Sequence, residues 1–385
     1  MKKTLIAAAL FAGFAGAAQA ETSVTLYGVI DTGLGYNKIS GAADGYNGSR
    51  VGMINGMQNG SRWGLRGSED LGDGLRAVFQ LESAFNSGNG KQGAGVAGQG
   101  SRLFDRQSTI GLASDSWGRL DFGRQTNIAS KYFESIDPFG TNYGMASMGV
   151  GMSAANMQRY DNMVMYQTPS FSGLQFGVGY SFSANDESLA RGRVNFRTAD
   201  NLRALTTGVR YVNGPLNVAL TYDQLNPSNA EAKNAGQVTP RSFMIGGSYD
   251  FEVVKLALAY ARTTNGWFAI SNPTGASGEM VRDRKVTDLG FGSNAATKDF
   301  KANSYMVGLS APIGGASSVF TSWQHVSAND KLTEDDATMN IFSLGYTYDL
   351  SKRTNLYAYG SYGKNYAFND GVKATAIGVG LRHRF

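Results

Sequence analysis

The chain has 385 residues, with 35 Lys and Arg against 30 Asp and Glu, a formal net charge of +5 and no cysteine. The small charge and the lack of a basic tract argue against a nucleic-acid-binding protein, and without cysteine no disulfide can stabilise the fold. A mean hydropathy of -0.25 is compatible with a soluble protein, and equally with a membrane protein in which only every other strand residue is apolar.

The first 20 residues predict a cleaved signal peptide. Two early lysines precede an apolar stretch (5–15), and Ala18 and Ala20 provide the small residues of a cleavage site. The apolar stretch is shorter than the ~20 residues that a membrane-spanning helix needs, which disfavours a permanent anchor. Cleavage would leave residues 21–385, that is 385 − 20 = 365 residues, with a charge of +3 because both lysines are removed.

The rest of the chain alternates apolar and polar residues with a period of two, which predicts β-strands. The alternation starts at Val24 and recurs from Leu174, Leu216 and Val254. The polar faces of these segments are rich in Gly, Ser, Thr and Asp, which suits a water-filled lumen better than a second buried sheet. The pattern therefore favours a barrel in a membrane over a soluble sandwich.

The connections between these segments alternate between short and long. The short ones are 68–74, 113–118, 212–215, 250–253 and 349–354, and the long ones lie near 36–60, 87–101, 182–203, 224–240, 264–302 and 327–339. Short turns at one end and long loops at the other are typical of outer-membrane barrels. Counting segments predicts an antiparallel transmembrane β-barrel of about 16 strands, an even number as in bacterial barrels. The last segment must pair with the first, because an open edge in lipid leaves backbone groups unpaired.

Four strings in this order resemble the general trimeric porins of Gram-negative bacteria, especially the branch of Bordetella-like β-proteobacteria. They are SVTLYGVIDTGLGY (23–36), SRWGLRGSEDLGDGLRAVFQLE (61–82), RQSTIGLASDSWGRLDFGRQ (106–125) and VGLRHRF (379–385). The resemblance covers essentially the whole mature chain. It implies an all-β, 16-stranded barrel that assembles as a homotrimer in the outer membrane, with a third long loop that folds inward and narrows the pore.

The segment that matches this constriction loop spans roughly 126–157. Porins of this family often carry a Pro-Glu-Phe-Gly-Gly turn in the loop, whereas this chain has Asp137, Pro138, Phe139 and Gly140. The glutamate after the proline is missing. One acidic group of the usual constriction is therefore shifted or absent.

The residues of interest in such a pore are inward-facing arginines and loop carboxylates, because fixed charges at the narrowest point sort solutes by charge. The family's wall arginines match Arg62, Arg106 and Arg159. The loop offers Glu134 and Asp137 on the opposite side. An arginine at mid-depth on the lipid face would cost about 2–4 kcal/mol, which also favours an inward orientation for arginines beside apolar neighbours.

Arg66, Arg76 and Arg124 are further candidates for the pore wall. Arginines also occur at barrel rims and in ordinary ion pairs, and turns are close to all three in the sequence. Glu134, for its part, could simply bind the loop to the barrel. Because candidate arginines outnumber loop carboxylates, the sequence predicts a modest preference for anions.

The sequence argues against an enzyme and suggests no cofactor or metal site. Its only histidines are His325 and His383, and no GxSxG turn, metal-spaced cluster or phosphate-binding loop is present. We therefore expect a general diffusion porin that passes small hydrophilic solutes and ions and contacts outer-membrane lipid and lipopolysaccharide. The alternative is a substrate-specific channel on the same barrel.

Overall fold

The computed structural model describes residues 23–41, 47–93, 102–184, 201–228, 238–270, 280–281, 284–285, 298–329 and 337–385. The predicted signal peptide, residues 1–20, lies outside them. Within the described ranges, no helix is both long enough and apolar enough to cross a membrane.

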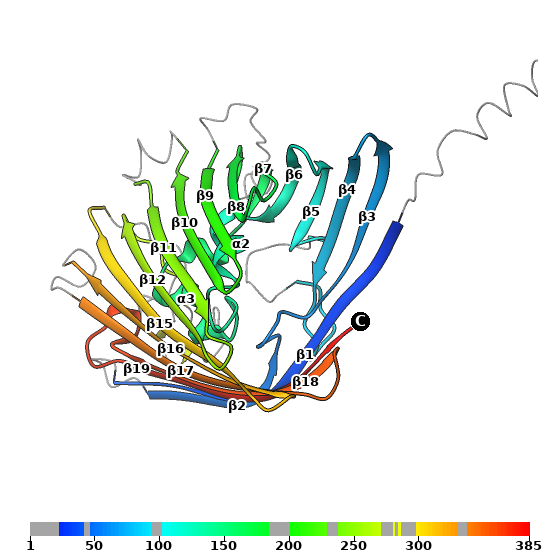
Figure 1. Ribbon diagram of the computed structural model, residues 1–385. Coiled ribbons are helices and arrows are strands. Elements are labelled where there is room, and N and C mark those ends of the chain that lie inside the picture. Colours follow the sequence, from blue (N-terminus) through cyan, green and yellow to red (C-terminus); the bar gives the residue numbers. More distant parts are fainter. Residues whose placement is uncertain are drawn as a thin grey trace, which may run out of the picture.

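Most of the described chain forms one antiparallel sheet (Figure 1). Its strands are β1 (Ser23–Ser40), β2 (Asn47–Asn55), β3 (Arg62–Gly72), β4 (Leu75–Ala84), β5 (Gln107–Ser114), β6 (Gly118–Thr126), β7 (Arg159–Gln167), β8 (Leu174–Ser181), β9 (Arg203–Asn213), β10 (Leu216–Asn226), β11 (Arg241–Asp250), β12 (Lys255–Thr264), β15 (Lys301–Ile313), β16 (Ser317–Ala328), β17 (Ala337–Asp349), β18 (Thr354–Lys364) and β19 (Lys373–Arg384). The short strands β13 (Met280–Val281) and β14 (Arg284–Lys285) pair only with each other.

The sheet closes into a barrel because its first strand pairs with its last. Residues 29–40 of β1 pair with β19, while the other edge of β1 pairs with β3 through residues 23–29 and with β2 through residues 32–40. β2 and β3 thus lie one after the other along the same edge of β1, and together they form a single interrupted strand. The 17 strands of the sheet therefore make a 16-stranded antiparallel barrel, as the sequence predicted.

One connection that the sequence predicted to be a loop is largely β-strand in the structure. The sequence suggested a long loop over 36–60, but β1 continues to Ser40 and β2 occupies Asn47–Asn55. The Gly, Asn and Ser content of this stretch suggested a loop, yet its backbone groups pair across the sheet. Only residues 56–61 interrupt the second strand, at the level where it passes the cavity described below.

Most strands bury one face and expose the other. Along β15, Met306 is 1% exposed, whereas its neighbours on the opposite face, Val307 and Leu309, are 39% and 41% exposed. The exposed face is apolar over most of the barrel, for example at Leu34 and Ile377. A soluble monomer rarely shows so much exposed apolar surface, whereas a barrel in lipid requires it.

Residues 127–158, between β6 and β7, form what we call the 127–158 loop. It contains α2 (Ile128–Phe133), η1 (Gly144–Ala146), α3 (Met148–Gly151) and η2 (Ala154–Met157). α2 begins after Asn127, whose side chain accepts a hydrogen bond from the Ser130 backbone N–H. α2 contacts β8, β9 and β10, and α3 contacts β15, β16 and β17. Figure 1 shows both helices on the concave side of the sheet.

Candidate functional site

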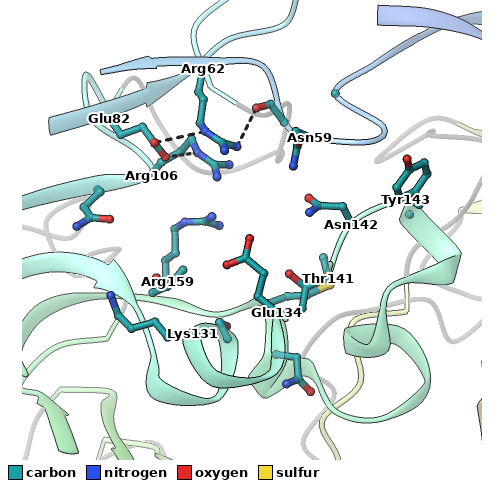
Figure 2. Close-up of a pocket in the computed structure, with 18 of the residues that line it drawn as sticks. Asn59, Arg62, Glu82, Arg106, Lys131, Glu134, Thr141, Asn142, Tyr143 and Arg159 are labelled. Atoms are coloured by element: carbon teal, nitrogen blue, oxygen red, sulfur yellow. Dashed lines mark hydrogen bonds and ion pairs between the residues drawn. The ribbon is translucent and has the colours of Figure 1, made fainter. Parts of the chain in front are cut away.

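A cavity of about 370 Å³ separates the 127–158 loop from the wall formed by β3, β4 and β7. On the wall side it is lined by Arg62 from β3, Glu82 from β4, Arg106 just before β5, and Arg159 from β7. On the loop side it is lined by residues that include Lys131 and Glu134. Figure 2 shows these charged side chains around one open space.

The wall arginines are held by a carboxylate between them. Glu82 Oε1 lies 2.6 Å from Arg106 Nε, and its Oε2 lies 3.4 Å from Arg62 Nε. The Tyr27 hydroxyl donates to Glu82 Oε2 at 3.0 Å, and Arg62 donates to the Gly60 carbonyl oxygen at 3.3 Å. Charge-assisted bonds of this kind fix the direction of a guanidinium group. Glu82 therefore orients two cations while cancelling only one of their charges.

Arg159 and the loop residues complete the ring of charge. Among the described residues, neither Arg159 nor Glu134 forms an ion pair within 4.0 Å, and Figure 2 shows the Glu134 carboxylate directed across the cavity toward the wall arginines. Burial lowers the pKa of the Lys131 ammonium group, and the nearby Asp121 carboxylate opposes this shift. The loop thus brings one cation and one exposed carboxylate to face the wall.

Asp137 does not take the position expected from the sequence. It is 5% exposed and does not line the cavity. Its Oδ1 accepts a hydrogen bond from the Phe139 backbone N–H at 2.9 Å, and its Oδ2 accepts from the N–H groups of Thr141 at 2.9 Å and Met148 at 3.2 Å. Burial raises its pKa to about 6, and these three donors oppose the shift. Asp137 therefore holds the turn of the loop together and does not face the arginines.

The three further arginine candidates lie outside the cavity lining. The Arg66 guanidinium is exposed, and its carbon lies 5.4 Å from the centre of the Tyr27 ring. Arg76 pairs with Asp115 at 2.7 Å at the end of the barrel that carries the short turns. Arg124 pairs at 2.6 Å with Asp161, which also binds Arg102 at 2.9 Å. These ion pairs tie strands and loops together, as one of the alternatives from the sequence allowed.

Glu82 and Lys131 are the lining charges that the sequence analysis missed. Glu82 could have been found from the alternation along β4, because it shares the face of Arg76, which was placed inward. Lys131 lies in the loop string that was quoted, but no strand periodicity applies there. Only the position of α2 in the folded chain brings its side chain to the cavity.

The lining carries a surplus of positive charge. Arg62, Arg106, Arg159 and Lys131 supply four cations, and Glu82 and Glu134 supply two carboxylates, so the formal sum is 4 − 2 = +2. Fixed charges in a narrow aqueous space between low-dielectric walls concentrate mobile ions of the opposite sign. In the described part of the chain, no group of three or more His, Cys, Asp or Glu side chains is placed to hold a metal ion.

Comparison with known proteins identifies the family. The model of the Gram-negative porin family matches residues 5–367 of this chain. The chain belongs to the Gram-negative porins. An outer membrane porin protein of Bordetella pertussis is 69% identical over the full length of both chains, and outer membrane porin protein 32 of Delftia acidovorans is 34% identical, again over both full lengths.

A solved structure supports the same family assignment. The anion-selective porin from Comamonas acidovorans superimposes with a TM-score of 0.69 at 28% sequence identity, covering 94% of this chain and all of that one. The porin assignment, the 16-stranded barrel and the location in the Gram-negative outer membrane, all predicted from the sequence, are confirmed. The relatives are named as porins, which are channels and not enzymes.

Proposed function

We propose that this porin is a general diffusion channel for small hydrophilic solutes and ions, and that the cavity between the wall arginines and the 127–158 loop is its selective constriction. The observation that carries the proposal is the +2 formal charge of the lining. It favours a modest preference for anions. The related porin of Comamonas acidovorans, which is described as anion-selective, supports the same sign.

The geometry suggests how the constriction sorts solutes. The wall side carries three arginines and Glu82, a formal sum of 3 − 1 = +2, whereas the loop side carries Lys131 and Glu134, which sum to zero. Because the charge on the two sides is unequal, and the Glu134 carboxylate faces the arginines, a field lies across the opening, which orients dipolar solutes and disfavours apolar ones. Because guanidinium groups stay protonated, the positive side persists at any physiological pH.

Two substitutions that replace a charged side chain with glutamine test the sign of the selectivity. In planar bilayers under a KCl gradient, the wild-type reversal potential should indicate anion selectivity. Arg159→Gln lowers the formal lining charge from +2 to +1 and should reduce the anion-to-cation permeability ratio by roughly twofold, whereas Glu134→Gln should raise it by a similar factor. Cation selectivity of the wild type, or shifts of the same sign in both variants, would contradict the proposal.

The same bilayer separates a general pore from a substrate-specific channel. For a general pore, flux rises linearly with solute concentration and falls with solute size. Conductance that saturates with one solute and is blocked by it would instead indicate a substrate-specific channel.

We also propose that residues 1–20 are removed during export and that the mature chain, residues 21–385, assembles as a homotrimer. One of the structurally similar proteins, OmpT of Vibrio cholerae, is described in a trimer form. The exposed apolar side chains of β1 and β2, such as Leu26, Val51 and Met53, offer surface for subunit contact. A band at three times the chain mass in unheated SDS samples, lost on boiling, is the expected result. Migration as a monomer without heating would contradict it.

A further inference from the structure

The interruption between β2 and β3 is a turn, residues 56–61, that forms part of the constriction. The turn residues that line the cavity are Gly56, Met57, Asn59 and Gly60. The Gly60 carbonyl oxygen accepts a hydrogen bond from the Arg62 guanidinium at 3.3 Å, in addition to the 3.4 Å contact between Arg62 and Glu82. Gly60 also lies against the next wall arginine, since a methyl group on its Cα would be 3.2 Å from Arg106 Nη1. The turn therefore supplies one of the contacts that direct the Arg62 guanidinium.

The same turn also contacts the loop side of the constriction. The Met57 carbonyl oxygen accepts a hydrogen bond from the Tyr143 backbone N–H at 2.8 Å. The Tyr143 ring is buried and packs edge-on against Tyr357 and Tyr359 of β18, with ring centres 5.8 and 5.5 Å apart. A displacement of the turn would therefore reach the 127–158 loop as well as the wall.

One buried carboxylate holds this turn in place. Asp31 lies in β1 and is fully buried, and its Oδ2 accepts a hydrogen bond from the Asn59 backbone N–H at 2.6 Å. Its other carboxylate oxygen, Oδ1, accepts from the Tyr357 hydroxyl at 2.7 Å. The Asp31 backbone carbonyl oxygen accepts from the Gly56 N–H, and its backbone N–H donates to the Ser61 hydroxyl oxygen, each at 3.0 Å. Asp31 therefore binds the turn at its first and last residues and in between.

The Asp31 carboxylate depends on these donors. It forms no ion pair within 4.0 Å in the part of the chain that the structure describes. Burying a carboxylate is costly unless hydrogen bonds satisfy its oxygens. If the turn moved away from β1, Asp31 Oδ2 would lose the Asn59 N–H and stay buried. The carboxylate therefore fixes the turn, with one further contact from Arg382 of β19, which donates to Asn59 Oδ1 at 2.6 Å.

We propose that Asp31 is a positioning residue for the constriction, and that its hydrogen bonds to the 56–61 turn keep Arg62 directed into the cavity. Asp31 itself does not line the cavity. It acts on passing ions through Gly60, whose carbonyl oxygen binds the Arg62 guanidinium, and through Met57, which binds the loop. The inference rests on the proposed function, because it concerns how the selective constriction keeps its shape.

Two substitutions of Asp31 separate positioning from charge, because both remove the same negative charge. Asp31→Asn can keep both hydrogen bonds, since its amide oxygen accepts from the Asn59 N–H and its NH2 group donates to the Tyr357 hydroxyl oxygen. Asp31→Leu has a similar shape and can keep neither. In planar bilayers under a KCl gradient, Asp31→Asn should keep or raise the wild-type anion-to-cation permeability ratio. Asp31→Leu should lower it roughly twofold and change the single-channel conductance, because the displaced turn leaves Arg62 to Glu82 on the wall and releases the loop.

Two tyrosines of β18 provide a matched pair of variants that leaves every charge in place. Tyr357→Phe removes the hydroxyl that donates to Asp31 and should lower the permeability ratio, by less than Asp31→Leu does. Tyr359→Phe removes a hydroxyl that has no hydrogen-bond partner among the described residues, and it should keep the wild-type ratio. In an Arg62→Gln background, Asp31→Leu should no longer lower the ratio, because its effect on selectivity passes through Arg62.

Three results would overturn the proposal. The first is the same permeability ratio and conductance in Asp31→Leu and Asp31→Asn. The second is an equal ratio in Tyr357→Phe and Tyr359→Phe, which would leave Asp31 a purely structural role, and this pair decides alone if Asp31→Leu does not fold. The third is a fall caused by Asp31→Leu that persists in the Arg62→Gln background. The wild-type reversal potential tests the proposed function separately, since each variant is compared with the wild type.

Discussion

At the scale of single residues, the carboxylates in and near the cavity have different roles. Glu82 lies on the wall and binds two arginines, while Glu134, on the loop side, forms no ion pair within the part of the chain that the structure describes. Asp137 lies inside the loop and accepts three backbone hydrogen bonds. Only the first two carboxylates contribute to the charge of the lining.

Replacing Glu82 tests its double role. Glu82→Gln raises the formal charge of the lining from +2 to +3 and removes the anion between Arg62 and Arg106. We expect a stronger anion preference in reversal-potential measurements, together with a lower unfolding temperature, because two close guanidinium groups then repel each other. Glu69→Gln, an exposed carboxylate near the β3–β4 turn, is the matched control and should change neither quantity. An unchanged reversal potential in Glu82→Gln would show that Glu82 does not act on passing ions.

Asp137 should make the loop more stable in mild acid. Its folded-state pKa of about 6 lies above the ordinary 3.8, so the stabilisation is fully present below about pH 4 and is lost as the pH rises through 6. The difference corresponds to about 3 kcal/mol between pH 4 and pH 7. Unfolding temperatures of wild type and Asp137→Asn, compared across this range, should show the wild type losing stability relative to the variant. A difference between the two that does not change with pH would refute the assignment.

Among the residue-level predictions, the arginines matched through the family resemblance lie together, whereas Arg66 and Arg76, which alternation alone placed inward, lie outside the cavity lining. Arg62, Arg106 and Arg159 were expected to converge, and all three line one cavity. Asp137 was misplaced because no periodicity operates in a loop, where local backbone donors decide the direction of a side chain. Whether Arg124 faces the pore or forms an ion pair stayed open in the sequence, because its ion-pair partner, Asp161, is distant along the chain.

At the scale of elements, the position of the 127–158 loop depends on glycines in the strands that it crosses. A methyl group on Gly308 of β15 would lie 2.3 Å from Pro138 Cγ, and one on Gly246 of β11 would lie 2.8 Å from the Phe133 ring. These glycines let the loop approach the backbone of the wall. The sequence showed many glycines, but which of them face the loop follows only from the closed barrel.

A single methyl group should therefore move the loop. Gly308→Ala pushes Pro138 away from the wall and toward the lumen by steric overlap, and we expect a changed single-channel conductance and a different size cut-off for neutral solutes. Gly360→Ala is the control, because it adds the same methyl group to a strand glycine with no atom within 4 Å. Equal conductance in the two variants would mean that the contact between Pro138 and β15 does not position the loop.

At the scale of the whole molecule, charge and polarity divide the barrel into distinct surfaces. The lining of the cavity is positive, the outward faces of β9–β12 and β15–β19 are apolar in their middle, and their loop ends are positive. The alternation of apolar and polar residues predicted the barrel and its location in a membrane, because a period of two is a local property of the sequence. The interrupted second strand was not predictable in this way, since β2 and β3 are defined by their pairing with β1.

Closure of the barrel is the property of the whole molecule that a terminal residue can test. Phe385 and Gly28 exchange two backbone hydrogen bonds of 3.1 Å, and the Phe385 ring lies over Gly28 so closely that a methyl group there would be 2.2 Å from Cζ. Phe385→Ala keeps the backbone bonds and removes the ring, so closure should persist with a loss of about 1–2 kcal/mol from the contact between the ring and Gly28.

In SDS gels, the folded band of Phe385→Ala should convert to the unfolded band at a temperature that is a few degrees lower than for the wild type. Leu381→Ala, on the lipid-facing side of the same strand, is the control and should shift this temperature less, because Leu381 is not packed over a glycine of β1. Gly28→Val should be more damaging than Phe385→Ala, since the ring and the added side chain cannot occupy the same space. If Gly28→Val and Phe385→Ala both melt like the wild type, the first and last strands are held together by their backbone hydrogen bonds alone.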